Sequence, residues 1–219
     1  MIEIEETQVC GWEAALRGMR NPLNSWKKAD SGYLEHPYYS EDTGALYTYT
    51  IGPNDMFLAK RLANAGTDHR KYLRMITVSA DITAPLYWWK EYDTYKVGTV
   101  ANSCSTMHKI HSRAFDISDF STDHLTYESR EQLRSTIIFM NNCRRRYVEY
   151  KNKEDWWQLI QLLPSSYNQK RTVLLNYEVL MNIYHSRKNH KLDEWHEFCE
   201  WVERLPYFCE FAGIETAEE

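Results

Sequence analysis

The chain has 219 residues, of which 43% are hydrophobic and 26% charged, and its formal net charge is −5. A folded chain of this length buries about 70% of the surface that it exposes when unfolded, so it needs no disulfide or metal for stability. The negative charge argues against a general nucleic-acid-binding surface, although a local basic pocket is compatible with it. The composition is that of an ordered globular protein, with disorder expected at the acidic tail, residues 215–219.

The first residues, MIEIEETQVC, contain neither a basic region nor an apolar run, so no signal peptide is expected. No apolar run approaches the roughly 20 residues that a membrane-spanning helix requires. The five cysteines are odd in number and irregularly spaced, which does not suggest a disulfide framework. We therefore expect a cytoplasmic protein with no membrane partner.

Eight tryptophans and sixteen tyrosines make the chain unusually aromatic. Such residues fill protein cores and subunit interfaces, because each buries a large apolar area. They also line pockets for planar ligands. The composition favours the first interpretation and leaves the second open.

In chain order, the first 50 residues show little periodicity apart from a short helix expected near residues 12–19. A second helix is expected from Pro53 to a stop at Gly66, with Asn54 as its N-terminal cap. Residues 74–84 then alternate between apolar and polar side chains, which predicts a strand with one buried face.

Pro85 ends this strand, and the aromatic and charged segment 86–95 is expected to be helical. Residues 97–106 are small and polar and include Gly98, which predicts a loop packed closely against another part of the chain. After a second loop at residues 112–123, helical periodicity marks four more segments, namely 128–149, 154–163, 169–186 and 191–204.

No repeat, linker or low-complexity stretch interrupts this order. We therefore predict one domain over residues 1–219, with an α/β (α+β) fold that is rich in helices and has a modest central sheet.

Glycine-rich phosphate loops, nucleophile elbows and zinc-protease motifs are absent from the sequence. Cys104 and His108 are four residues apart, as on one helix face, but they lack further ligands, so no metal site is predicted. Cations gather beside expected turns and helix ends, at residues 68–71, 90, 96, 170–171 and 187–188. An anionic ligand would need such cations, but salt bridges within the protein would use them equally well.

Residues 82–107 resemble the core of the flavin-dependent thymidylate synthases. Members of that family have a strand, then Ala-Pro, then a helix with Arg-Gln, and then the signature RHRxxSxNExSxRY. The correspondence needs no gap. Lys90-Glu91 falls on Arg-Gln, Thr94-Tyr95-Lys96 on RHR, Thr99 on the first serine, Ala101-Asn102 on Asn-Glu, Cys104 on the second serine and Thr106-Met107 on Arg-Tyr.

Two flanking segments are similar to the same family. Residues 66–74 resemble the HGHxTPxEH turn that precedes the strand. Further along, Leu163-Pro164, Thr172, Asn176, Leu180, Asn182, Ile183 and Arg187 follow the spacing of LP…T…NxxxLxNFxxxR, and His190 and Glu194 match HAQxE after a one-residue deletion. The resemblance covers residues 54–108 and 160–197.

This resemblance implies a homotetramer that binds FAD between subunits and methylates dUMP, with methylenetetrahydrofolate as methyl donor and NADPH as reductant. It implies a catalytic, pyrimidine-contacting role for Arg187. The other implied nucleotide-binding residues are Lys90, Glu91, Thr99, Asn102 and Cys104. The implied cofactor-binding residues are His69, Arg70, Lys96, Asn176, Asn182 and His190.

The chain departs from the family pattern where charge matters. Thr94 and Thr106 replace arginines of the signature, Ile160 replaces a further nucleotide-contacting arginine, and Asn102 replaces the glutamate. Losing several charged partners weakens phosphate binding by orders of magnitude unless other cations take their place. Lys90, Lys96 and Arg171 are the candidates for that replacement.

Three functions therefore stay open. The first is a divergent flavin-dependent methyltransferase for a pyrimidine nucleotide. The second is an inactive protein of phage or mobile-element type that binds or sequesters a nucleotide. The third is a structural assembly protein whose pocket is filled by Trp88, Trp89 and Tyr95. Cys104 is expected to be a small buried hydrophobic residue, with a reactive thiolate as the alternative.

Overall fold

The computed structural model of the chain describes residues 2–41 and 45–214, so the predicted disorder of the acidic tail lies outside the described residues. The chain forms two compact units. Unit 1 comprises the residues up to Glu3, Thr83–Thr94 and Asn102–Arg171, and unit 2 comprises Ile4–Ile82, Tyr95–Ala101 and the residues from Thr172 onward. The prediction of a single domain stays a prediction.

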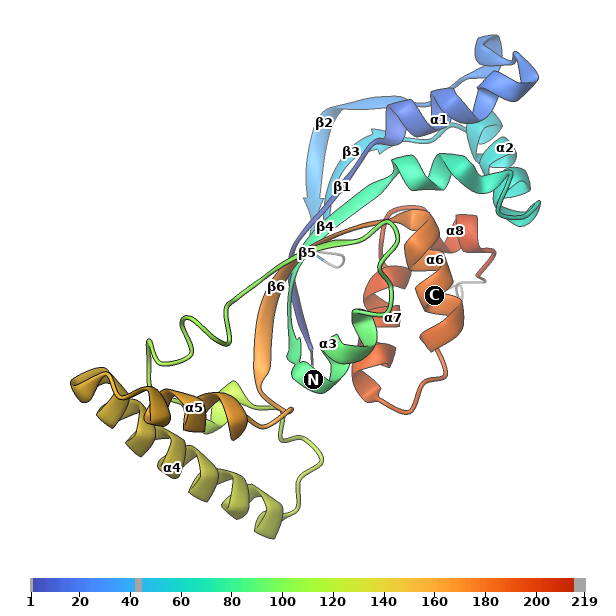
Figure 1. Cartoon of the computed structure of the whole chain (residues 1–219). Coiled ribbons are helices and arrows are strands. Elements are labelled where there is room, and N and C mark those ends of the chain that lie inside the picture. The colour runs from blue at the N-terminus through green and yellow to red at the C-terminus, as the bar shows by residue number, and fades with distance from the viewer. Residues whose placement is uncertain (1, 42–44, 215–219) are drawn as a thin grey trace. The chain divides into compact units, whose positions relative to one another are not determined.

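Strands in the order β1-β4-β6-β5 form a four-stranded sheet (Figure 1). Their bounds are Glu3–Cys10 for β1, Thr77–Pro85 for β4, Val100–Ser103 for β5 and Asn168–Asn176 for β6, and each strand has residues in both units. A second, antiparallel sheet pairs β2 (Gly32–Ser40) with β3 (Ala45–Thr50).

The helices of unit 2 enclose an aromatic core. They are α1 (Trp12–Arg20), α2 (Pro53–Asn64), α6 (Tyr177–Arg187), α7 (Asp193–Glu203) and α8 (Phe208–Ala212), with short 3-10 turns η1 (Asn21–Leu23), η2 (Trp26–Lys28) and η3 (Arg70–Met75). Tyr177 is fully buried and meets Trp12 and Phe208 edge to face, at ring separations of 5.5 and 5.7 Å. Its hydroxyl donates to the carbonyl of Pro206 at 2.6 Å, which satisfies its polar atom.

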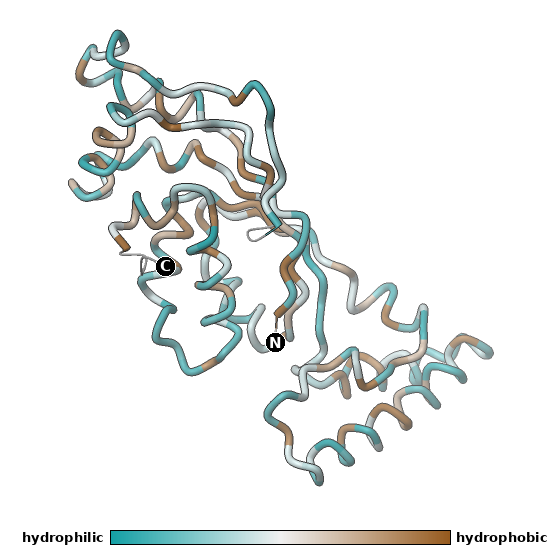
Figure 2. The backbone as a smooth tube through the Cα atoms, turned by 180° about the vertical axis from the view of Figure 1, so that it is seen from behind, coloured by the Kyte–Doolittle hydropathy of each residue, from teal (hydrophilic) through white to brown (hydrophobic). Residues whose placement is uncertain are grey.

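Unit 1 holds α3 (Leu86–Tyr92), α4 (Tyr127–Tyr150), α5 (Lys153–Gln161) and the short turn η4 (Ile117–Asp119). In Figure 2, hydrophobic and hydrophilic residues alternate along α4, as in a helix with one buried face. That face packs on α5 and the preceding loop through a cluster of buried residues: Ile110, Phe115, Phe120, Leu133, Ile137, Met140, Cys143 and Leu159.

Most of the expected elements are confirmed. The helices expected at 12–19, 53–66, 128–149 and 191–204 correspond to α1, α2, α4 and α7, and 154–163 to α5. The strand expected at 74–84 is β4, whose Val78, Ala80 and Ile82 are buried while their neighbours are half-buried. The helix expected at 86–95 is confirmed but ends at Tyr92. Within the described residues, no helix is long and apolar enough to cross a membrane.

The single helix predicted over residues 169–186 is wrong. Residues 168–176 form β6, in which buried Gln169, Val173 and Leu175 alternate with more exposed neighbours, and only then does α6 begin. The alternation was masked because the apolar residues of the strand run directly into those of the helix. The sequence analysis also missed β5 inside the predicted 97–106 loop, the strands β1 to β3, and α8.

The cap of α2 comes from a distant part of the chain rather than from Asn54. Asp30 accepts hydrogen bonds from the backbone N–H groups of Asn54 and Asp55, at 2.8 and 3.0 Å. Asp55 is 1% exposed and pairs with the equally buried Arg20 at 2.5 Å. The other carboxylate oxygen of Asp55 accepts from the backbone N–H of Asp30 and from the hydroxyl of Ser31.

Removal of the Asp55 carboxylate is expected to unfold this part of unit 2. Asp55→Ala should lower the free energy of unfolding by about 3–5 kcal/mol, because it leaves the Arg20 guanidinium buried and unpaired. Chemical denaturation measures this, with Asp193→Ala, at an exposed carboxylate of α7, as the control. An effect equal to that of the control would contradict the prediction.

The same carboxylate makes stability depend on pH. Burial alone would raise the pKa of Asp55, but hydrogen bonds from Ser31, Asp30 and Arg20 outweigh it and hold the pKa below its usual value. The stabilisation is therefore present above the unfolded pKa of about 4 and is lost as the pH falls through the lower folded pKa. Asp55→Asn should remove the part of the pH dependence of the free energy of unfolding that this carboxylate causes.

Candidate functional site

A close backbone approach fixes the segment Tyr95–Ala101 in unit 2. Gly98 has a φ of +75°, and a Cβ atom placed on it would lie 2.8 Å from Nδ2 of Asn176 and 3.0 Å from the Val179 side chain. Asn176 itself caps α6, since its Oδ1 accepts from the backbone N–H of Val179 at 3.0 Å. The expected tight packing of this segment is thus confirmed, and its partner is the start of α6.

Arg187, at the other end of α6, reaches the same segment. Its Nε donates to the hydroxyl of Tyr95 at 2.8 Å, and its guanidinium carbon lies 4.9 Å from the ring centre of Trp195. Thr99 donates its hydroxyl to the backbone carbonyl of Tyr95. The structure therefore brings two of the predicted nucleotide-binding residues, Thr99 and Arg187, to one tyrosine.

The hydrogen bond with Tyr95 orients the planar guanidinium of Arg187. Trp195 is fully buried, so the indole is a rigid surface for the guanidinium, and the contact is a cation–π interaction. His190 lies beside the same ring, 6.3 Å between centres, and its Nδ1 accepts from the backbone N–H of Leu192. This arrangement suits paired hydrogen bonds to a base edge or a phosphate.

A second group of predicted residues meets on the outer side of α6. Arg70 donates from Nη2 to Oδ1 of Asn182 at 3.0 Å and from Nε to Glu178 at 3.4 Å. Glu178 is buried and also binds Arg74. The neighbouring His69 lines a pocket of about 520 Å³ in unit 2, beside apolar Met75 and other residues of η3 and α1. Three predicted cofactor-binding residues therefore belong to one region around η3.

Cys104 and Thr106 of the signature segment line a separate pocket in unit 1, of about 630 Å³. Lys109 and Lys170 line it as well, together with the hydroxyls of three serines, Ser105, Ser112 and Ser118. Cys104 is exposed, so the expectation of a small buried hydrophobic residue is wrong. Cys104 directly follows β5, whose four residues are all exposed.

Two hydrogen bonds hold Cys104 against β6. Its backbone N–H donates to the carbonyl of Lys170 at 3.0 Å, and its carbonyl accepts from the side chain of Gln169 at 2.6 Å. Tyr167 closes the pocket, and burial, with Asp119 next to it, raises the pKa of its hydroxyl. Tyr167 is therefore a neutral hydrogen-bond donor at physiological pH.

The other predicted residues are more dispersed. Lys90 and Lys96 are exposed, and Asn102 is exposed on β5. The backbone carbonyl of Glu91 accepts from Thr94 in the turn that ends α3. Among the residues that the structure describes, no group of three or more His, Cys, Asp or Glu side chains could hold a metal ion.

Arg171 does not serve as a replacement cation. It donates to Asp93 at 2.7 Å and to Gln169 at 3.0 Å, and its guanidinium stacks over Trp89 at 4.2 Å. Trp88 and Trp89 are themselves fully buried in unit 1. These residues are therefore structural, and the two tryptophans belong to the core rather than to a pocket wall.

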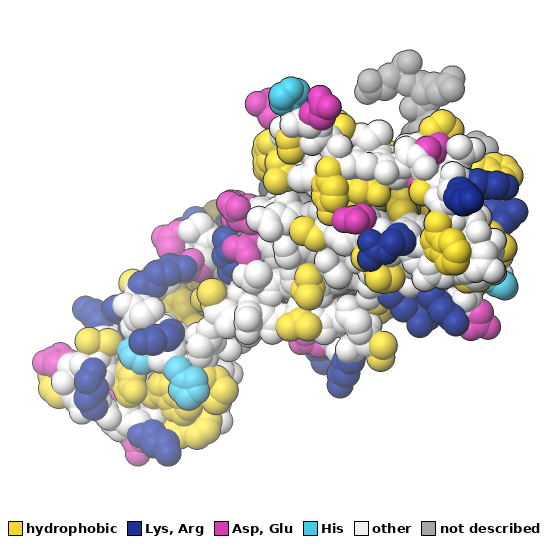
Figure 3. Space-filling view, turned by 90° about the horizontal axis from the view of Figure 1, so that it is seen from above, with side chains coloured by type: hydrophobic (Ala, Val, Ile, Leu, Met, Phe, Trp, Pro, Cys, Tyr) yellow, Lys and Arg dark blue, Asp and Glu magenta, His cyan; other side chains and the backbone are white. Residues whose placement is uncertain are grey.

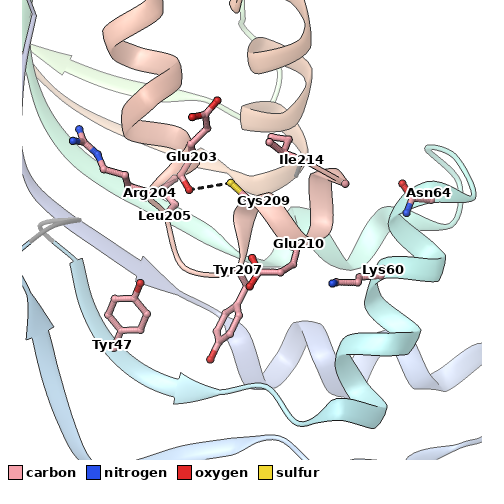
Figure 4. A pocket seen from close by; sticks show the side chains of 11 residues that line it. Tyr47, Lys60, Asn64, Glu203, Arg204, Leu205, Tyr207, Cys209, Glu210 and Ile214 are labelled. Carbon is pink, nitrogen blue, oxygen red and sulfur yellow. Dashed lines mark hydrogen bonds between the residues drawn. The ribbon is translucent and has the colours of Figure 1, made fainter. Parts of the chain in front are cut away.

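Sequence reasoning missed Tyr95 and Trp195 as site residues. Tyr95 was named only as one of the residues that fill the pocket in a structural assembly protein, and Trp195 was not singled out. The available signal was the position of Tyr95, in the middle of the segment that falls on RHR. A further pocket of unit 2, of about 820 Å³, lies among β3, α2 and the C-terminal helices (Figure 4), and none of the predicted residues lines it.

Gly98→Ala is expected to separate the segment Tyr95–Ala101 from α6. The methyl group would meet Asn176 and Val179 at a residue with positive φ, so the free energy of unfolding should fall by about 1–3 kcal/mol. Gly213→Ala is the matched control, because Gly213 has a φ of +65° but only an ordinary contact at 3.7 Å. Equal losses of stability, measured by denaturation, would show that the contact with Asn176 is unimportant.

No protein-family model matches the chain, and no curated protein matches it. Its structure is similar to two solved structures of the flavin-dependent thymidylate synthase ThyX from Helicobacter pylori in complex with FAD and dUMP. Both have a TM-score of 0.65 and 16% sequence identity, and they cover 96% and 97% of this chain and 97% of the solved chain. The chain therefore has the expected helix-rich α/β fold of the flavin-dependent thymidylate synthases.

Proposed function

We propose that this chain binds a pyrimidine nucleotide and FAD. The observation that carries the proposal is the contact of Arg187 and Asn176 with the segment Tyr95–Ala101, which contains Thr99. It occurs in a fold whose solved examples hold FAD and dUMP. Two residues assigned from the resemblance, at the two ends of α6, thus contact the segment that holds a third, Thr99.

On the nucleotide side, Arg187 is the principal residue. Its Nε is occupied by Tyr95, which turns the planar guanidinium in one direction, and Trp195 supports its face. A pyrimidine edge offers neighbouring acceptors that a guanidinium can bind in pairs.

On the flavin side, the residues present fit the cofactor. Arg70 and Asn182 supply hydrogen-bond donors next to each other, and His69 lines a pocket whose other walls are largely apolar. A pocket of about 520 Å³ is in the size range of small-molecule sites and takes one part of a dinucleotide such as FAD. Bound FAD supplies hydride transfer, which no amino-acid side chain can perform.

Whether catalysis follows depends on the altered signature. The full reaction would methylate the nucleotide with methylenetetrahydrofolate and NADPH. A second candidate is a nucleotide-binding protein without turnover, which Ile160 favours. This residue, which falls on a nucleotide-contacting arginine of the family, packs against the hydrophobic cluster of unit 1 and offers no charge.

Substitution of Arg187 tests the nucleotide site. Calorimetric titration with dUMP should show affinity falling about 10- to 150-fold for Arg187→Ala, because hydrogen bonds from a charged group are lost. The affinity of Arg187→Lys should lie between those of the wild type and Arg187→Ala, since lysine keeps the positive charge but not the paired N–H donors of the guanidinium. The control is Arg17→Ala, at an exposed arginine of α1. Equal affinities for the Arg187 and Arg17 variants would refute the assignment.

The flavin proposal is tested by titrating the purified protein with FAD and following flavin absorbance and fluorescence. We expect saturable binding that Asn182→Ala weakens about tenfold, through loss of a hydrogen bond in a polar site. A protein that takes up no FAD would contradict it. Formation of dTMP with methylenetetrahydrofolate and NADPH then identifies the enzyme, and binding without product identifies the second candidate.

Assembly into a homotetramer is part of the proposal, because the sites of the resembled family are shared between subunits. Exposed apolar side chains support it: on α4, Ile138 is 63% and Phe139 is 48% exposed. Light scattering should give four times the chain mass of 26.1 kDa. Ile138→Glu should lower that mass, whereas Thr67→Glu, the same charge on an exposed turn, should not. A wild-type monomer at micromolar concentration would contradict the prediction.

A further inference from the structure

A basic and aromatic pocket lies in unit 1 at the junction of α4 and α5, apart from the residues assigned above. Its volume is about 340 Å³. It is lined by His108, His111, Lys151 and Lys153, with Tyr147, Trp156 and Met107 as the less polar walls. Among these lining residues none is acidic, although the chain as a whole carries a net charge of −5. Figure 3 shows basic and histidine side chains among hydrophobic ones on the part of the surface formed by unit 1.

The pocket is held together by contacts that fix its histidines. Arg144 of α4 donates from Nε to the carbonyl of His111 at 2.9 Å. Trp156 of α5 donates from Nε1 to the carbonyl of Met107 at 3.1 Å. The segment 107–111 is therefore attached to both helices at its two ends. Such a pocket needs little reordering to accept a ligand.

Two side chains of the pocket, those of His111 and Lys151, lie against Tyr147. Nδ1 of His111 is buried and has no hydrogen-bond partner among the described residues, and its ring lies 4.8 Å from that of Tyr147. Lys151 ends α4 as its left-handed C-cap, with a φ of +57° and its backbone N–H donated to the carbonyl of Tyr147. Its ammonium lies 5.8 Å from the centre of the Tyr147 ring, over the pocket wall.

We propose that this pocket binds a phosphate monoester that also contains a planar ring. The ligand would be the size of a mononucleotide. The lysines and histidines would hold the phosphate, and Tyr147 and Trp156 would hold the ring by stacking. The small volume and the net negative charge of the chain favour a single nucleotide over a nucleic-acid strand. The proposal is independent of the function proposed for Arg187.

The protonation of His111 gives a second way to detect binding, through the pH dependence of the affinity for an anion. The charged and titratable groups around it are Arg144 of α4, Lys151 directly after α4, Lys153 of α5, and Lys109 and His108 of its own segment. Burial lowers the pKa of His111, and the cations Lys151, Lys109 and Arg144 lower it further. A bound dianion should raise this pKa, so affinity for an anion of constant charge, such as sulfate, should rise as the pH falls.

The experiment follows the imidazole resonances of His108 and His111 by NMR during titration with 5′-AMP, inorganic phosphate and adenosine. We expect AMP to bind about tenfold more tightly than phosphate, because stacking adds to the charge interaction, and adenosine to bind most weakly. Lys151→Met combined with Lys153→Met should weaken AMP binding about tenfold. The double variant Lys27→Met and Lys28→Met removes the same charge from exposed residues of η2 and should bind like the wild type.

Several results would overturn the proposal. They are an absence of shifts at His108 and His111 up to millimolar AMP, equal affinities for the two double variants, and adenosine binding as tightly as AMP. A short single-stranded oligonucleotide that binds more tightly than AMP would mean a nucleic-acid groove instead. Arg187→Ala should leave these resonances and their shifts unchanged, which separates this pocket from the site proposed above.

Discussion

The candidate site depends on one steric constraint, the close approach of Gly98 to the side chain of Asn176. Asn176 ends β6 and caps α6, so its position is set by two elements at once. Since there is no room for a Cβ atom on the facing residue, the backbone of the 95–101 segment can come this near only at a glycine. Tyr95 is thereby brought to Arg187 at the far end of the same helix.

The cations of this acidic chain divide by what they contact. Arg20, Arg70 and Arg171 are tied to buried or half-buried acids and amides, and they hold the fold together. Their charges are compensated inside the protein, so they contribute little to attracting a ligand. Arg187 donates to the hydroxyl of Tyr95 and lies against the rings of Tyr95 and Trp195.

The aromatic residues serve two purposes that composition could not separate. Trp12, Tyr177 and Trp89 are buried and pack as ordinary core residues, with their polar atoms bonded to backbone carbonyls where they need a partner. Trp89, Tyr95 and Trp195 each also meet a cation, since Arg171 lies over Trp89 and Arg187 lies against Tyr95 and Trp195. The same residue type thus forms core in one place and a support for a charged side chain in another.

Sequence alone determined the elements whose apolar period is uninterrupted, such as α4 and β4, and the resemblance on which the fold was predicted. It also named Arg187 and Thr99 as nucleotide-binding residues, which stays a prediction, without showing that both contact Tyr95. Tertiary structure decided the rest. It split residues 169–186 into strand and helix, exposed Cys104, and tied Arg171 to Asp93. The reason is physical: local periodicity fixes which face of an element is buried, whereas the partner of a charge or of a glycine comes from a distant part of the chain.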